Sequence, residues 1–582
     1  MIQNQTRSII TDDSDDNQLS YGNNLNHEES VNFVSTLSQY RQRMEHSHYL
    51  KLFKLSLKRN SSQVYCEFCQ LLVPVARVLI ERNQSQHIEN VAITFCKEFK
   101  LIDESVCIGA VHEYKDAVIQ VVGLSKLTSK QLCALAFGCE QQSQIPALNW
   151  NVTFPNVPKP PVSPPQPPAP GAPKMRILHI SDIHIDFAYR PQSLAECSQP
   201  LCCRYGTPAP GHIGAGFWGD YRNCDLPLWT AEEILKYIAE MEEFDIIYHT
   251  GDLPSHNVWN QSRADQLYAI ETITNLLKKY FPNKVFYSAV GNHETAPCNL
   301  YPTPLIETDN ITWLYTSLAD HWIQLGLPEE TRASILRGAF YTTLIHSGLR
   351  LISLNMNYCS TENYWLFINS TDPLDQLQWL VNWLQYAEDN NEKVHIIAHH
   401  PPRSCLESFS WNFYRIVNRY ENTIAGQFYG HAHNDEFIMF YDEVDKTRPV
   451  SMAYVTPSLT TASFLNPGYR IYTVDGYHDS TTYWVLDHHT VIMNLTASNL
   501  FNRTIFIDEY SVKTDYQMDY LFPNDWNNFI NRLEADIDGN LMGLVYQYYT
   551  KSFANGTVCD HNCREGLLCN FKRARSETPC SD

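Results

Sequence analysis

The chain has 582 residues and a formal net charge of −21, with 44% hydrophobic and 12% aromatic residues. This length favours two to four domains, and the apolar content is sufficient for sizeable cores. A nucleic-acid-binding surface needs clustered Lys and Arg, so the acidic balance argues against a nucleic acid partner. The same charge argues against strong electrostatic docking to anionic membranes.

Residues 1–60 are rich in Asn, Ser, Gln and Asp and are expected to form a disordered leader. They contain no apolar stretch like the core of a signal peptide. A transmembrane helix needs about 18 or more consecutive apolar residues, and no such run occurs in the sequence. No transmembrane helix is therefore predicted.

The cysteines and glycosylation motifs favour the secretory pathway. Seventeen cysteines are many for a cytosolic enzyme. Ten Asn-x-Ser/Thr sequons begin at Asn4, Asn60, Asn83, Asn151, Asn260, Asn310, Asn369, Asn494, Asn502 and Asn555. We therefore expect a secreted, extracellular or lysosomal protein, with no signal peptide visible in this sequence.

Residues 61–143 form a Cys-rich block with helical periodicity. The spacing of its six cysteines is Cys66-x2-Cys69, Cys96-x10-Cys107 and Cys133-x5-Cys139. Six cysteines allow fifteen pairings, so spacing alone does not fix the disulfides. A zinc site built on Cys66 and Cys69 is the alternative, although Cys133 and Cys139 are poorly spaced as its second ligand pair.

Residues 144–173 are expected to be a linker, since residues 155–173 hold ten prolines in nineteen positions. Such a stretch should act as a semi-rigid polyproline II spacer. From residue 174 to 485, short apolar runs alternate with helical patterns, which predicts an α/β sandwich domain. The best helical pattern covers residues 373–388, with Asp372 as its N-cap. Residues 486–582 are expected to form a helical C-terminal subdomain.

Polar clusters follow five of the predicted strands. They are Asp182-Ile-His184, Gly-Asp252, Gly-Asn292-His293-Glu294, His399-His400 and Gly-His431-Ala-His433. Side chains at the ends of such strands gather at one edge of a sheet. Imidazole and carboxylate groups are ligands for divalent transition metals, so the sequence predicts a metal site at this edge.

The order of these motifs resembles the calcineurin-like metallophosphoesterase family, over roughly residues 175–475. The resemblance implies a β-sandwich flanked by helices and two divalent metal ions. Of the metals that the family uses, zinc is the one expected here. It assigns Asp182, His184 and His433 to one metal, and Asn292, His399 and His431 to the other, with Asp252 bridging them.

A phosphodiester has a poor leaving group, which needs a proton as it departs. His293 is the first candidate for this acid, because it follows Asn292 directly, and His256 is the second. For His256 the alternative is a histidine in a surface loop. His179 and His249 are expected to be core or supporting residues, and His400 to face away from the site because neighbouring strand residues alternate.

The cysteine block resembles a saposin B-type domain, which implies the pairs Cys66–Cys139, Cys69–Cys133 and Cys96–Cys107. A small helical domain held together by disulfides can expose apolar surface to a bilayer without unfolding. The alternative is a helical block that only packs on the catalytic domain.

The whole arrangement over residues 60–582 resembles the acid sphingomyelinase family, with supporting stretches such as LISLNMNYC (351–359) and LNPGYR (465–470). This resemblance implies the further disulfides Cys197–Cys202, Cys203–Cys224, Cys359–Cys405, Cys559–Cys563 and Cys569–Cys580. Cys298 then stays unpaired; we expect an incidental buried cysteine, and the alternative is a free thiol near the site.

The family's reaction is hydrolysis of sphingomyelin to ceramide and phosphocholine. The implied partner is sphingomyelin in membranes or lipoproteins, met through transient membrane contact of the saposin domain by a monomeric enzyme. Two alternatives are a nucleotide or small-phosphodiester phosphodiesterase of the sphingomyelinase-like branch, and a lipid-binding pseudo-enzyme.

Overall fold

A computed structural model describes residues 62–98, 100–138, 142–303, 306–553, 557–577 and 580. The chain divides into two compact units, Met1–Val64 and Tyr65–Asp582, and the description below concerns the second. The leader expected over residues 1–60 lies outside the described residues. Among those described, no helix has the length and apolar character needed to cross a membrane.

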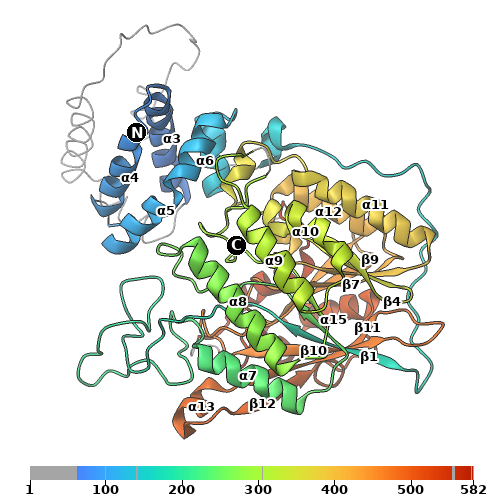
Figure 1. Ribbon diagram of the computed structural model, residues 1–582. Coiled ribbons are helices and arrows are strands. Elements are labelled where there is room, and N and C mark those ends of the chain that lie inside the picture. Colours follow the sequence, from blue (N-terminus) through green and yellow to red (C-terminus); the bar gives the residue numbers. More distant parts are fainter. Residues whose placement is uncertain are drawn as a thin grey trace, which may run out of the picture. The chain divides into compact units, whose positions relative to one another are not determined.

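Four helices make up the N-terminal Cys-rich block (Figure 1). They are α3 (Ser62–Glu81), α4 (Gln86–Glu98), α5 (Glu104–Leu124) and α6 (Ser129–Phe137). The Asp103 side chain caps α5 by accepting from the Ser105 amide, and Thr128 and Gln131 form a capping box at the start of α6. Such caps satisfy amides that have no partner within the helix.

Disulfides hold these helices together. Cys69 on α3 pairs with Cys133 on α6, and Cys96 on α4 pairs with Cys107 on α5. These are two of the pairs that the saposin resemblance implies. Cys66 is also disulfide-bonded, but its expected partner, Cys139, lies outside the described residues.

The Pro-rich linker is tied to the catalytic domain. Two short 3-10 turns, Gln142–Gln144 and Pro146–Leu148, lie at its start, before the proline run of residues 155–173. The Val152 amide donates to Asn412 Oδ1 over 3.0 Å, and the Ser163 amide donates to Asn422 Oδ1 over 2.9 Å. Side chains of the catalytic domain thus bind the backbone of the predicted spacer at two points along its length.

Two six-stranded sheets form the centre of the catalytic domain. The first has the order β12-β11-β10-β1-β2-β3 and the second β4-β5-β6-β7-β9-β8. The first sheet contains β1 (Lys174–Ile180), β2 (Ile246–His249), β3 (Phe286–Ser288), β10 (Gly468–Asp475), β11 (Val485–Met493) and β12 (Phe506–Ser511). The second contains β4 (Tyr341–His346), β5 (Leu349–Ser353), β6 (Lys393–Ile397), β7 (Ile424–Tyr429), β8 (Glu436–Tyr441) and β9 (Pro449–Val455).

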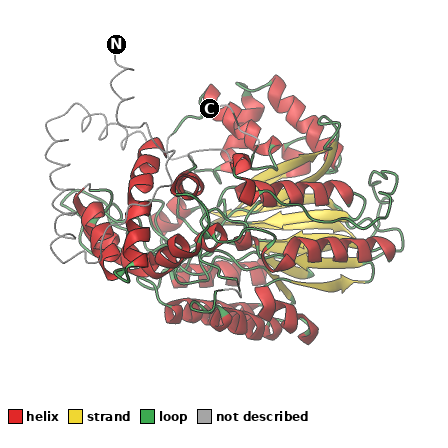
Figure 2. Cartoon of the chain, turned by 90° about the horizontal axis from the view of Figure 1, so that it is seen from above, coloured by secondary structure: helices red, strands yellow, loops and turns green. Residues whose placement is uncertain are grey.

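The predicted apolar runs coincide with parallel strands, β1–β2–β3 in one sheet and β5–β6–β7 in the other. Parallel strands are covered on both faces, which explains why their sequences are continuously apolar. Side chains of both sheets, such as Ile177 and Phe428, belong to one buried cluster. This is the β-sandwich flanked by helices that the resemblance implies, with helices outside both layers (Figure 2).

The helices that follow the strands of the first sheet are α7 (Leu228–Met241), α8 (Arg263–Tyr280), α9 (Thr312–Gln324) and α10 (Arg332–Gly338). The outer face of the second sheet packs on α11 (Gln376–Asp389) and α12 (Glu407–Arg419). The helix predicted over 373–388 starts later, because residues 373–375 form a 3-10 turn. Asp372 still accepts from the Leu377 and Gln378 amides, so it caps α11 from across this turn.

The C-terminal region is not purely helical. It begins with β11 and β12 of the first sheet, which α13 (Leu495–Phe501) connects. Four helices follow β12, namely α14 (Val512–Asp515), α15 (Pro523–Ala535), α16 (Asn540–Tyr549) and α17 (His561–Lys572). The division expected at residue 486 falls within β11. The reason is that β11 pairs with β10 along its whole length, so the sheet and the C-terminal region share one core.

Candidate metal centre

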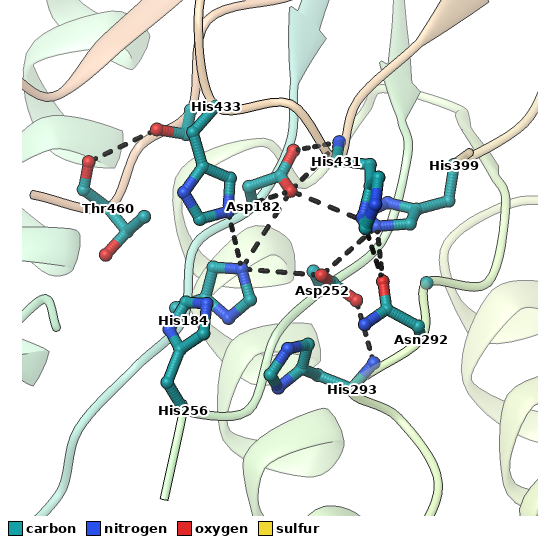
Figure 3. A network of polar contacts seen from close by, with 12 residues as sticks. Asp182, His184, Asp252, His256, Asn292, His293, His399, His431, His433 and Thr460 are labelled. Atoms are coloured by element: carbon teal, nitrogen blue, oxygen red, sulfur yellow. Dashed lines mark hydrogen bonds and ion pairs between the residues drawn. The ribbon is translucent and has the colours of Figure 1, made fainter. Parts of the chain in front are cut away.

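The polar motifs lie where the parallel strands end, at one edge of the two sheets (Figure 3). Each occupies the turn that follows its strand. Five residues of these turns adopt left-handed backbone conformations, namely Asp182 (φ 52°), His184 (φ 44°), Asp252 (φ 61°), His431 (φ 70°) and His433 (φ 62°). Such conformations are costly for residues other than Gly and cluster at functional sites.

The first group of donors is Asp182, His184 and His433. His184 Nε2 lies 3.1 Å from His433 Nε2, and His433 Nε2 lies 3.4 Å from Asp182 Oδ1. His184 is oriented by its other nitrogen, because Nδ1 lies 2.8 Å from the Pro254 carbonyl oxygen. Its Nε2 therefore presents a lone pair to the other two side chains.

The second group is Asp252, His399 and His431, with Asn292 beside them. His399 Nε2 lies 3.1 Å from Asp252 Oδ2 and 2.9 Å from Asn292 Oδ1, and His431 Nδ1 lies 3.1 Å from the same amide oxygen. The Thr250 carbonyl oxygen, 2.6 Å from His399 Nδ1, fixes which nitrogen faces the group.

Asp252 lies between the two groups. Its Oδ2 is 3.4 Å from His184 Nε2 on one side and 3.1 Å from His399 Nε2 on the other. All seven residues assigned as ligands from the sequence are thus brought together. Their donor atoms, imidazole nitrogens and carboxylate or amide oxygens, are of the type that holds a pair of divalent metal ions.

The buried carboxylates make this edge favour positive charge. Burial lowers the pKa of an imidazole, but Asp182 and Asp252 outweigh burial and raise the pKa of His184 to about 9. Burial is opposed in the same way by Asp252 and Asp182 at His399, whose pKa is also raised to about 9. A site with this charge balance fits bound cations.

The two candidate acids lie against the first group. The ring centres of His256 and His184 are 3.9 Å apart, and those of His293 and His256 are 4.6 Å apart. The His293 amide donates to Asp252 Oδ1 over 2.9 Å, while its buried Nδ1 has no hydrogen-bond partner among the described residues. His256 therefore belongs to the site and not to a remote surface loop.

Two acidic residues of the site were assigned no role from the sequence. Asp225 Oδ1 lies 2.7 Å from His256 Nδ1, and Asp225 Oδ2 accepts from the His256 amide over 2.6 Å. Burial alone would raise the pKa of Asp225, but the imidazoles of His256 and His184 lower it below its ordinary value. No spacing links Asp225 to a motif, because it approaches His256 only through the fold.

The second of these residues, Glu294, joins two of the turns. It accepts from the Leu253 amide over 2.8 Å and from the Gly291 amide over 2.7 Å. A signal for it exists in the sequence, since Glu294 ends the Gly-Asn-His-Glu motif. The two turns approach so closely that a Cβ on Gly291 would collide with the Asp252 side chain.

One expectation about the neighbouring histidines is wrong. His400 does not face away: its ring centre lies 4.1 Å from that of His431, and its Nε2 is 3.2 Å from Asn357 Oδ1. The strand alternation used for that expectation does not apply, because β6 ends at Ile397. His179 and His249 are buried beneath the site, in supporting positions.

The remaining disulfides lie around this domain. The structure pairs Cys197–Cys202, Cys203–Cys224, Cys359–Cys405, Cys559–Cys563 and Cys569–Cys580, the same pairs that the family resemblance implies. Among the described residues, Cys298 is free and buried. Its Sγ lies 3.4 Å from the Asn292 carbonyl oxygen, so it packs beneath a candidate ligand.

Comparison with known proteins agrees with this geometry. The family description "Calcineurin-like phosphoesterase" matches residues 175–435, and "Acid sphingomyelin phosphodiesterase C-terminal region" matches residues 448–577. The sphingomyelin phosphodiesterase of Bos taurus is 45% identical over 86% of this chain and 80% of its own length. The sphingomyelin phosphodiesterase of Homo sapiens is 43% identical over 88% of this chain and 82% of its own length.

The chain belongs to the sphingomyelin phosphodiesterase family. A more distant relative is the cyclic GMP-AMP phosphodiesterase SMPDL3A of Homo sapiens, which is 28% identical over 67% of this chain and 86% of its own length. As a family member with a metallophosphoesterase region, the chain is a phosphodiester hydrolase whose site is built for divalent metal ions.

Proposed function

We propose that this family member hydrolyses sphingomyelin to ceramide and phosphocholine. The observation that carries the proposal is the convergence of seven metal-type donors and two histidines in a chain that shares 45% identity with a sphingomyelin phosphodiesterase. A lipid-binding pseudo-enzyme would not need to keep this complete set of donors.

The N-terminal block favours the lipid over a nucleotide substrate. Residues 144–582 make up about three quarters of the chain, so an alignment over 86% must extend into residues 1–143. The relative named for cyclic GMP-AMP aligns with only 67% of this chain. The relative named sphingomyelin phosphodiesterase therefore aligns with part of the Cys-rich block, which supports a lipid substrate for this chain.

We assign the block the role of a saposin B-type domain that touches the membrane transiently. Large apolar side chains of its helices are exposed, including Val78, Ile108, Leu124 and Phe137. Other apolar residues of the same helices, such as Val121 and Leu132, pack on Trp365 and Phe367 of the catalytic domain. One surface thus anchors the block and the other remains open to lipid.

In the proposed site, Asp182, His184 and His433 would hold one zinc ion, and Asn292, His399 and His431 would hold a second, with Asp252 placed to serve both. Zinc suits ligand sets that are rich in imidazole. When bound, the two ions would polarise the phosphodiester and activate a water molecule.

The chain's own residues supply the proton. Hydrolysis forms a bond between water oxygen and phosphorus and breaks the bond to the ceramide oxygen, which must be protonated as it leaves. An ionised Asp225 only accepts hydrogen bonds, so it holds the proton of His256 on Nδ1 and leaves Nε2 for the leaving oxygen. His293, the first candidate from the sequence, donates its backbone amide to Asp252, and its ring lies 4.6 Å from that of His256 as the other proton donor of the site.

The disulfides also support a location in the secretory pathway, outside the cell or in lysosomes. Bonds of this number persist only in oxidising compartments or in proteins that pass through them. We propose that the enzyme acts there as a monomer on sphingomyelin of membranes or lipoproteins.

The test is a substrate panel on the purified protein. We expect phosphocholine release from sphingomyelin vesicles, loss of this activity on chelation, and its return with Zn²⁺. ATP and a cyclic dinucleotide should be poor substrates. His293→Ala should lower turnover with metal content unchanged, whereas the control His561→Ala, on α17 and half exposed, should behave as wild type. Preference for the nucleotides, or no turnover of sphingomyelin by metal-loaded enzyme, would refute the proposal.

A further inference from the structure

A long connection between β1 and α7 lies beside the site. Residues 187–225, called here the stapled loop, contain two disulfides, Cys197–Cys202 and Cys203–Cys224. The loop ends at Asp225, which holds His256. Its position is therefore fixed directly against the candidate catalytic machinery.

The stapled loop joins the Cys-rich block to α13. On one side, Ser198 Oγ donates to Asp103 Oδ2 over 2.6 Å, at the start of α5. On the other side, the Trp218 amide donates to Asn499 Oδ1 over 2.9 Å, and Asn499 is a residue of α13. Figure 1 shows the loop on the same side of the domain as α5 and α13.

Large apolar side chains project into solvent from this connection and from α13. Ile213 is 82% exposed, Phe217 is 47% exposed and Leu500 is 74% exposed. We call these three residues the apolar rim. Phe501 is also exposed, but it adjoins the Asn502 sequon and is left out of the rim.

The backbone under the rim is held rigidly. Trp229 Nε1 donates to the Phe217 carbonyl oxygen over 2.9 Å, and the Phe217 ring lies 5.5 Å from the Trp229 ring. Asn499 Nδ2 donates to the Gly219 carbonyl oxygen over 3.0 Å. The apolar side chains are therefore presented by a fixed surface, which lowers the ordering cost of binding.

Charge is absent from both segments that carry the rim. Residues 205–219, YGTPAPGHIGAGFWG, contain no Asp, Glu, Lys or Arg, and neither do residues 493–502, MNLTASNLFN. An apolar surface carried by segments without ionised side chains suits the interface of a neutral bilayer.

We propose that the apolar rim is a second bilayer-contacting surface, on the catalytic domain itself. The inference rests on the proposed function, because a lipid substrate keeps its phosphodiester at the level of the headgroups. Insertion of Ile213, Phe217 and Leu500 to the boundary of headgroups and acyl chains brings the loop that ends at Asp225 to that level. The Cys-rich block and the rim then hold the bilayer at two places, with the stapled loop between them.

The experiment uses the full chain and vesicles of phosphatidylcholine and sphingomyelin. The triple variant Ile213→Ser, Phe217→Ser and Leu500→Ser should bind vesicles at least tenfold more weakly in a flotation assay. Its rate on a soluble phosphodiester, bis(p-nitrophenyl) phosphate, should stay within twofold of wild type. The single variant Ile213→Trp, at a highly exposed position, should tighten vesicle binding, because indole favours the membrane interface.

Two control variants change exposed apolar residues elsewhere. Val444→Ser, at a residue 94% exposed between β8 and β9, and Met241→Ser, at a residue 64% exposed at the end of α7, should bind vesicles as wild type does. Wild-type vesicle binding by the triple variant would overturn the proposal. Equal loss of activity on the soluble diester would also overturn it, because the loop would then act by supporting the site. Failure of the proposed function would appear separately, as absence of phosphocholine release by the wild-type enzyme, since flotation does not depend on turnover.

Discussion

Replacement of Asp225 by Asn tests how His256 is held. In the structure, the Asp225 carboxylate is fully buried and contacts both Nδ1 and the backbone amide of His256, at 2.7 and 2.6 Å. Asn has nearly the same shape, so the fold should be retained. Its amide group, however, has no negative charge to stabilise a protonated imidazole and can turn its NH2 group toward Nδ1.

The expected loss follows from the strength of this contact. A hydrogen bond to a charged group contributes about 1.5–3 kcal/mol, and each 1.4 kcal/mol changes a rate about tenfold. If the bond acts fully in the transition state, Asp225→Asn should lower kcat on sphingomyelin by about tenfold to 150-fold. KM should change little, because Asp225 is buried behind His256.

The assay is steady-state release of phosphocholine, together with metal content and thermal unfolding of the same preparations. Asp220→Asn is a matched control, because Asp220 lies on the same stapled loop and pairs with Arg222 instead of a site histidine. A kcat within threefold of wild type, with metal retained, would show that Asp225 does not position the acid. A large loss of metal would assign it to the metal centre instead.

Three further predictions concern the support of the site and the stability of the fold. Gly291→Ala should abolish metal binding and lower activity more than 100-fold, since the added Cβ would collide with Asp252. The control Gly566→Ala, where no atom lies within 4 Å of the added Cβ, should leave metal content unchanged. Lys551→Met should lower activity about tenfold, because the buried Lys551 Nζ donates to Ser458 O and Oγ. The loop that contains Ser458 also supports a candidate ligand, since the Thr460 amide donates to the Asp182 carbonyl oxygen. Unchanged kcat and metal content would contradict this prediction. Glu509→Gln should remove a loss of stability between pH 5 and pH 7, because burial raises the pKa of Glu509 to about 8 from an ordinary value near 4.5. In that range the unfolded chain releases a proton that the folded chain keeps, so the free energy of unfolding of the wild type falls as pH rises, by on the order of 2–3 kcal/mol. Urea unfolding that gives the same change in free energy between the two pH values for wild type and variant would refute this.

The sequence by itself determined the layers and the candidate ligands. The short apolar runs of residues 174–485 predict buried strands, and β7 (Ile424–Tyr429), buried along its whole length, is one of them. The motifs carry the donors directly after these strands, and parallel strands of a sheet end at one edge. Local pattern was sufficient there because the motif and the strand that positions it are adjacent in the chain.

Only the tertiary structure decided the partners that lie far apart in sequence. Asp225 approaches His256 across 31 residues, and Lys551 approaches Ser458 across 93. The same holds for the orientation of His400, which depends on where β6 ends, and for the contact of the stapled loop with α13. Such contacts depend on how separate elements pack, and neither periodicity nor spacing within one segment encodes that packing.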